Sequence, residues 1–212
     1  MIKKYIWLNP IVEAMVRKNR HEVREVLEKK GYTIVACTNG AGLVRKAYLD
    51  YVSKTSRLPV IDARCPKVTT LIREKYPLLA DNIAPIEPIL LTCAEELYAK
   101  YVTPDVKGTA LIVISPCTWL VKRGDLLFGE KVCFLTWKDF CEKEGLSNYP
   151  RLEASPVPPG FFTGLDLPVI EANGGKDVEA VLQRASEKTL PRGTLLLELL
   201  YCEGGCHLGD GL

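Results

Sequence analysis

Four of the eight cysteines stand at positions where they could hold a metal. Cys65, Cys117 and Cys202 each follow the end of a predicted strand, and Cys206 comes four residues after Cys202, with two glycines between them. In open α/β sheets, ligands collect beyond the carboxyl ends of the strands. Thiolates are soft ligands that suit iron–sulfur clusters or zinc. The four cysteines therefore predict one metal site at the end of a sheet.

The spacing of these cysteines favours a [4Fe–4S] cluster over zinc. Zinc sites usually come from two short-spaced pairs, whereas here Cys65 and Cys117 stand alone and only Cys202 and Cys206 form a close pair. The glycines allow the backbone to approach a cluster and to donate N–H groups to its sulfur atoms. Zinc bound by the same four cysteines and four unrelated cysteines are the alternatives.

Three further residues are candidates for a role near this site. Arg64 precedes Cys65 and could donate to a cluster sulfur or a bound anion; otherwise its side chain is solvated or salt-bridged. His207 follows Cys206 and could tune a cluster potential by hydrogen bonding; otherwise it is exposed. Cys37 ends a predicted strand and could be an extra ligand or a redox thiol. The remaining cysteines are expected to be small buried hydrophobic residues: Cys93, Cys133 and Cys141.

The elements that must position these residues alternate between strands and helices. This alternation predicts an α/β fold of two βα lobes with mixed, mostly parallel sheets. Strands are predicted over residues 5–8, 33–37, 58–62, 110–115, 131–135, 168–171 and 194–200. Helices are predicted over residues 21–29, 42–54, 67–76, 88–100, 137–144 and 176–188. A division near residue 88 gives lobes 1–88 and 89–212.

Composition excludes several classes of partner. The 28 basic residues nearly balance the 26 acidic ones, for a net charge of +2, and this argues against a nucleic-acid partner. No apolar run approaches the roughly 18–20 residues of a membrane span, and the N-terminus does not read as a signal peptide. We therefore expect a cytoplasmic protein, in which a framework of structural disulfides is not expected.

The sequence resembles the catalytic domain of the iron-only, or [FeFe], hydrogenases. That family carries the motifs T-S-C-C-P, M-P-C-x-x-K and C-x-G-G-C-x-x-G-G-G. The corresponding stretches here are DARCP at 62–66, SPCTWL at 115–120 and CEGGCHLGDG at 202–211. Flanking segments are similar as well, so the resemblance covers nearly the whole chain, which is shorter than the usual domain. It implies two lobes with a [4Fe–4S] cluster in the cleft between them, held by Cys65, Cys117, Cys202 and Cys206.

The chain departs from this family at the residues that serve diiron chemistry. In the family, the cysteine corresponding to Cys206 also bridges to a diiron unit that carries CO and cyanide. The proton-transferring cysteine corresponds to Arg64 here, and the cyanide-binding lysine corresponds to Leu120. The motif methionine and a relay serine correspond to Ser115 and Ala84. The resemblance therefore implies a protein that keeps the [4Fe–4S] cluster and lacks the diiron unit.

We therefore expect a hydrogenase-like [4Fe–4S] protein of an anaerobe that transfers electrons or senses redox state, without hydrogen turnover. Its expected partner is a ferredoxin-like redox protein or another subunit, and a homo-oligomer is left open. Two alternatives belong to other classes: a divergent [FeFe] hydrogenase with a complete diiron cluster, and a structural or regulatory subunit in which the cluster pins the two lobes together.

Overall fold

The computed structural model describes residues 2–16, 20–146, 152 and 160–212, and the chain forms two compact units. The first unit comprises residues 1–40, 90–157 and 207–212, and the second comprises residues 41–89 and 158–206. The predicted division near residue 88 lies beside one change of unit, between residues 89 and 90. The other changes of unit were not predicted, because they depend on which strands pair with one another.

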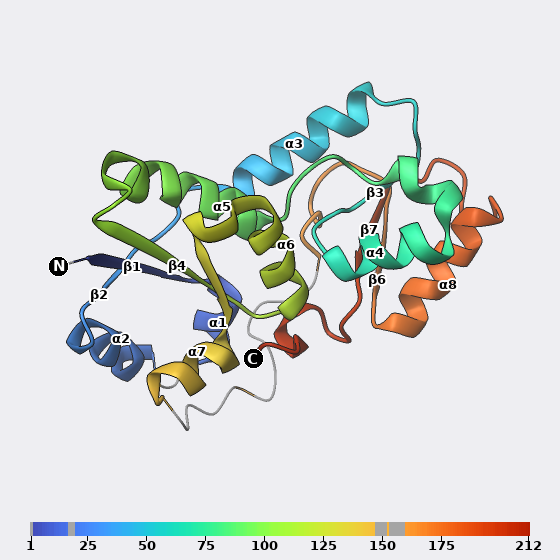
Figure 1. The fold of residues 1–212 in the computed structure, drawn as a ribbon. Helices are drawn as coiled ribbons and strands as arrows, with labels where there is room; N and C mark the ends of the chain where they lie inside the picture. The colour runs from blue at the N-terminus through green and yellow to red at the C-terminus, as the bar shows by residue number, and fades with distance from the viewer. Residues whose placement is uncertain (1, 17–19, 147–151, 153–159) are drawn as a thin grey trace. The chain divides into compact units, whose positions relative to one another are not determined.

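A four-stranded parallel sheet forms the centre of the first unit. Its strands, in spatial order, are β2 (Tyr32–Ile34), β1 (Lys3–Leu8), β4 (Thr109–Ser115) and β5 (Cys133–Thr136). Its α-helices are α1 (Pro10–Met15), α2 (Arg20–Lys29), α5 (Ile89–Leu97), α6 (Thr118–Phe128) and α7 (Trp137–Glu144). Short helical turns follow α5 and α6: η3 (Tyr98–Val102), η4 (Thr103–Asp105) and η5 (Gly129–Lys131). Figure 1 shows α2 and α7 on one side of this sheet and α5 on the other.

The core of the first unit follows from the register of its two central strands. Ile6 and Leu8 of β1 stand beside Ile112 and Ile114 of β4. Since side chains alternate between the faces of a strand, these four residues share one face, where they pack with residues of α1, α2 and α7. Val113 points to the other face and is also fully buried. Burial on both faces explains why these strands are continuous apolar runs in the sequence.

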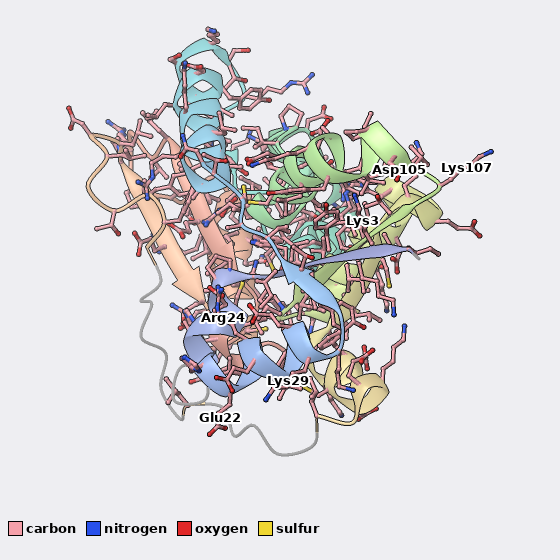
Figure 2. All side chains as sticks on the ribbon, turned by 90° about the vertical axis from the view of Figure 1, so that its left-hand side faces the viewer. Lys3, Glu22, Arg24, Lys29, Asp105 and Lys107 are labelled. Atoms are coloured by element: carbon pink, nitrogen blue, oxygen red, sulfur yellow. The ribbon has the colours of Figure 1, made fainter. Side chains whose placement is uncertain are left out.

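Helix α2 carries charges that suit its two ends. Glu22 lies in its first turn and Lys29 in its last turn, where each favours the helix dipole. Arg24 pairs with Glu13 of α1, with 2.8 Å between Nη2 and Oε1. Figure 2 shows Glu22, Arg24 and Lys29 along this helix, away from the labelled residues Lys3, Asp105 and Lys107. The polar face of α2 is thus turned outward and its apolar face covers the sheet.

The second unit is built around a three-stranded parallel sheet. Its strands, in spatial order, are β3 (Val60–Ile61), β7 (Leu196–Leu200) and β6 (Val169–Asn173). Its helices are α3 (Gly40–Lys54), α4 (Pro66–Lys75), the 3₁₀-helix η2 (Pro77–Asn82) and α8 (Gly175–Ser186). Leu197 and Leu199 pack with residues of α4 and α8. Leu196 packs on the other face with Tyr48 of α3 and with Phe162.

The α/β fold with parallel sheets is confirmed. All seven predicted strands and all six predicted helices are present, with ends shifted by a few residues, and helices α1 and α6 were not predicted. None of the helices in the described part of the chain is both long and apolar enough to cross a membrane.

Candidate metal centre

In the second unit the structure brings Cys65 and Cys202 together. Cys65 lies between β3 and α4, and Pro66 begins that helix. Burial raises the pKa of the Cys65 thiol, and the nearby Cys202 thiol raises it further. The backbone N–H groups of Tyr201 and Val68 act in the opposite direction, because they stabilise a thiolate. Two thiols and two backbone donors thus meet where β3 and β7 end.

A tight turn made by two glycines joins Cys202 to Cys206. Gly204 and Gly205 have φ angles of 69° and 85°, which side chains other than hydrogen rarely allow. The Gly205 N–H donates to the Cys202 carbonyl oxygen at 3.0 Å, and the Gly204 N–H donates to Asn173 Oδ1 at 2.9 Å. The turn is thereby held against the end of β6. Cys206 completes it as the last residue of the second unit and the first residue of the 3₁₀-helix η6 (Cys206–Leu208).

Cys117 belongs to the first unit, where it lies between β4 and α6. The buried Ser115 hydroxyl accepts the Cys117 N–H at 3.1 Å and donates to the Cys117 carbonyl oxygen at 2.9 Å. The set of four cysteines is therefore divided between the two units, three in the second and one in the first. Within the described part of the chain, no group of three or more His, Cys, Asp or Glu side chains already has an arrangement that could hold a metal ion.

Residues beyond Cys206 return to the loop that carries Cys117. Asp210 accepts hydrogen bonds from the Thr118 N–H at 2.9 Å and from the Thr118 hydroxyl at 2.6 Å. The Gly211 N–H donates to the Pro116 carbonyl oxygen at 3.1 Å. A Cβ on Gly211 would lie 2.8 Å from Thr136 and 3.0 Å from the Cys117 nitrogen, so only glycine fits there without movement of its neighbours. Asp210 thus supplies a side-chain cap for the first turn of α6. The loop that carries Cys117 is held by hydrogen bonds at Pro116, before the cysteine, and at Thr118, after it.

Replacing Asp210 with alanine is expected to lower the free energy of unfolding by about 0.5–2 kcal/mol, because the first turn of α6 loses its acceptor. Burial would raise the pKa of Asp210, but the hydrogen bonds from Thr118 outweigh burial and lower it. A lowered pKa in the folded state gives stability above the unfolded pKa of about 3.9 that is lost as the pH falls through the folded value. Urea unfolding should therefore show a larger difference at pH 7 than near pH 3. Exposed Asp166, replaced by alanine, is the control and should change little at either pH.

Arg64 is held in a buried network of charges beside Cys65. Its Nε donates to Asp62 Oδ2 at 2.9 Å, and its Nη2 lies 2.7 Å from Glu198 Oε1. Asp62 is fully buried and Glu198 is 2% exposed. Burial would lower the pKa of Arg64, but Asp62 and Glu198 outweigh it and the pKa is raised. The salt-bridged alternative for Arg64 is therefore confirmed, and contact between Arg64 and a bound cofactor stays a prediction.

Aromatic rings and the backbone complete this network. The Arg64 guanidinium lies over the Phe161 ring, 4.1 Å from its centroid. The N–H groups of Phe161 and Phe162 donate to the Glu198 carboxylate at 2.9 and 3.2 Å. The Tyr48 hydroxyl donates to Asp62 at 2.8 Å. Sequence analysis missed Glu198, although a single charge within the apolar run 195–200 is a signal of a buried, paired carboxylate.

The other sequence-predicted residues have different outcomes. His207 is 4% exposed and burial lowers its pKa, so the expected alternative of an exposed side chain is wrong. Its contact with a cluster stays a prediction. Cys93 is buried and Cys141 is half-buried. Cys133, which was expected to be buried, is exposed because it begins the edge strand β5. Cys37 is half-buried and its thiol donates to Glu96 Oε2 at 3.1 Å.

Comparison with solved structures shows which fold this is. The structure is similar to an [FeFe]-hydrogenase studied for oxygen inactivation of its H cluster, with a TM-score of 0.71 and 15% sequence identity over 99% of this chain and 80% of that one. It is similar to HydA(deltaEFG), studied for stepwise assembly of the H cluster, with a TM-score of 0.70 and 15% identity over 99% and 79% of the two chains. A variant of the [FeFe]-hydrogenase HydA1 from Chlamydomonas reinhardtii gives a TM-score of 0.69 and 15% identity over 99% and 80%.

These comparisons confirm the resemblance at the level of the fold. The described chain has the fold of [FeFe]-hydrogenases in a shorter form. Comparison of the sequence with protein-family models and with curated proteins finds no match.

Proposed function

We propose that this protein binds a [4Fe–4S] cluster through Cys65, Cys117, Cys202 and Cys206 and uses it to transfer electrons or to report redox state. The observation that carries the proposal is the approach of Cys65 to Cys202 beside a glycine turn that ends in Cys206. This arrangement occurs in a chain with the fold of [FeFe]-hydrogenases. A bound cluster would supply a one-electron couple, whose potential depends on hydrogen bonds to its sulfur atoms and on its exposure.

The donor set of the second unit suits such a cluster. Cys65 and Cys202 supply soft ligands, and the N–H groups of Tyr201 and Val68 already stabilise negative charge on sulfur. The raised pKa of Cys65 favours the protonated thiol, so metal binding to this thiol would release a proton. We include Cys117 among the ligands because it lies in the second sequence motif and because hydrogen bonds to Ser115 and Asp210 hold its loop.

The residues at the positions that serve diiron chemistry support a protein without hydrogen turnover. Arg64 uses its Nε and Nη2 to pair with Asp62 and Glu198, and a guanidinium does not lose its proton in proteins. Leu120 is buried and has no polar atom that could donate to a cyanide ligand. Ala84 is buried as well and carries no hydroxyl. Each of these side chains lacks the group that the corresponding hydrogenase residue would supply.

Anaerobic reconstitution of the full chain with iron and sulfide tests the proposal. We expect about four iron and four sulfide ions per chain and a broad visible absorbance that dithionite bleaches. Electron paramagnetic resonance should then show a reduced [4Fe–4S] cluster. A site that takes up zinc but forms no cluster would contradict the proposal. After supply of the diiron cofactor, infrared bands of CO and cyanide with hydrogen evolution would instead support the divergent hydrogenase.

We further propose that a ferredoxin-like redox protein, or another subunit, exchanges electrons with the cluster in the cytoplasm of an anaerobe. A cluster that carries electrons should be reduced by such a protein in a stopped-flow measurement, at a rate that falls with ionic strength if charged surfaces guide the encounter. A cluster that remains oxidised with every low-potential donor, in a chain that unfolds without it, would favour the structural subunit.

A further inference from the structure

Cys37 and Cys93 form a pair of thiols outside the proposed metal centre. Cys37 follows β2, Cys93 lies on α5, and both belong to the first unit. A hydrogen bond joins the two thiols. Gly40 marks how close they are, because a Cβ added there would clash with the Cys93 sulfur and lie 3.2 Å from the Cys37 sulfur. Both sulfur atoms therefore lie next to the position that a side-chain methyl group on residue 40 would occupy.

A carboxylate stands beside this pair, ready to accept a proton. Glu96 lies one turn after Cys93 on α5, and its Oε2 accepts the Cys37 thiol at 3.1 Å. Its Oε1 accepts the Thr38 N–H at 2.9 Å and the Thr38 hydroxyl at 2.7 Å. The hydrogen bonds from Cys37 and Thr38 lower the pKa of Glu96, so that it is ionised at neutral pH. The Cys37 proton is thus directed at a fixed anion.

We propose that Cys37 and Cys93 form a reversible disulfide, which makes this thiol pair a second redox site with a small organic disulfide as its oxidant. Cys37 is half-buried and Cys93 is buried, so the oxidant first meets Cys37. The Cys37 sulfur bonds to one sulfur of the oxidant, whose S–S bond breaks, and the Cys37 proton passes through Glu96 to the thiolate that leaves. The Cys93 sulfur then displaces the second thiolate, which takes the Cys93 proton. The pair gives up two electrons, and the oxidant ends as two thiols.

The environment of Cys93 suits a stable disulfide. Burial, followed by the hydrogen bond with Cys37, raises the pKa of the Cys93 thiol. Disulfides become strong oxidants when the protein stabilises their reduced form, as a low thiol pKa does, and Cys93 has the opposite property. A disulfide also removes two buried S–H groups without creating a buried charge.

The bond would join two segments that lead from one unit to the other. The chain passes from the first unit to the second after residue 40 and returns to the first unit after residue 89. Cys37 lies just before the first of these points, and Cys93 lies just after the second. Oxidation of the pair would therefore close residues 38–92 into a covalent loop that contains helices α3 and α4.

The test is to equilibrate the cluster-loaded full chain with buffers of oxidised and reduced glutathione under anaerobic conditions. After acid quenching and alkylation of free thiols, digestion and mass spectrometry measure each cysteine. We expect one disulfide-linked peptide pair that contains Cys37 and Cys93, with both thiols lost together and both recovered with dithiothreitol. In Cys93→Ser, Cys37 should stop at the mixed disulfide with glutathione, whereas Cys141→Ser should form the Cys37–Cys93 bond as before.

Two results would overturn this inference. One is that Cys37 and Cys93 both stay alkylatable at every buffer ratio while exposed Cys133 forms a mixed disulfide. The other is that Cys37→Ser or Cys93→Ser loses its iron, because the thiols would then belong to the metal centre. The inference does not depend on the proposed function, since a chain that binds no iron can still form the disulfide, and a chain that forms no disulfide can still bind the cluster.

Discussion

Replacing Arg64 with methionine is expected to lower the free energy of unfolding by about 3–5 kcal/mol. Methionine keeps an unbranched apolar stem of similar length but removes the guanidinium that pairs with Asp62 and Glu198. Asp62 is fully buried and Glu198 is 2% exposed, so water cannot replace the lost hydrogen bonds. Breaking a buried ion pair by removing one partner typically costs this much, because an uncompensated charge is left behind. Urea unfolding followed by circular dichroism measures the change.

The matched control for this prediction is Arg57→Met. The Arg57 and Asp81 side chains are 59% and 80% exposed, with 3.8 Å between Nη1 and Oδ1. Exposed pairs of this kind contribute about 0–1 kcal/mol, so Arg57→Met should unfold almost like the unchanged chain. Arg64→Lys should fall between the two, because lysine restores the charge but not the two-sided hydrogen bonding. Equal urea midpoints for Arg64→Met and Arg57→Met would show that the network does not stabilise the second unit.

The parallel sheets could be predicted because their central strands β4 and β7 are buried on both faces. The run at 110–115 is apolar except for its last residue, and helical patterns separate it from the strand before it. Helix α1 was missed although the chain carries its signals. Asn9 accepts the Ile11 N–H at 2.9 Å, and Pro10 begins the helix. The helix has only six residues, which is fewer than two turns, so its apolar face repeats too few times to be recognised in the sequence.

Helix α6 could not be predicted from its own residues. The acceptor for the N–H of Thr118, its first residue, is Asp210, which lies 92 residues further along the chain. Gly124 in its middle lowers helix propensity, yet a Cβ there would lie 2.7 Å from the Phe134 ring. Glycine at position 124 therefore allows α6 to pack closely against β5. Tertiary packing here outweighs the low helix propensity of glycine.

The approach of two candidate ligands was predictable from the sequence, whereas the surroundings of the candidate site were not. Cys65 and Cys202 follow strands that turned out to be neighbours in one sheet, so their approach follows from the parallel topology. One partner of Arg64, Glu198, lies 134 residues away in the sequence. The pairing of Cys37 with Cys93 likewise depends on how α5 packs in the first unit. Local sequence identifies residues that can do chemistry, whereas contacts distant in sequence decide what each residue touches.

Replacing any one of Cys65, Cys117, Cys202 and Cys206 with alanine is expected to remove most of the iron that the reconstituted chain binds. Each iron of a [4Fe–4S] cluster is held by one cysteine thiolate, so one substitution leaves one iron without its protein ligand. Iron and sulfide analysis with visible absorbance measures the loss. Cys133→Ala and Cys141→Ala are the controls, since both remove a thiol outside the proposed set, and they should bind as much iron as the unchanged chain.

The Cys117 variant decides between two forms of the metal centre. Cys65, Cys202 and Cys206 all belong to the second unit, and Cys117 alone belongs to the first. If all four thiols hold one cluster, Cys117→Ala should lose as much iron as Cys202→Ala while its circular dichroism stays that of a folded chain. Full iron content in Cys117→Ala, with loss in the other three, would place the cluster within the second unit and contradict the four-cysteine set. Full iron content in all four variants would exclude these cysteines as the ligands, and with them the proposed function.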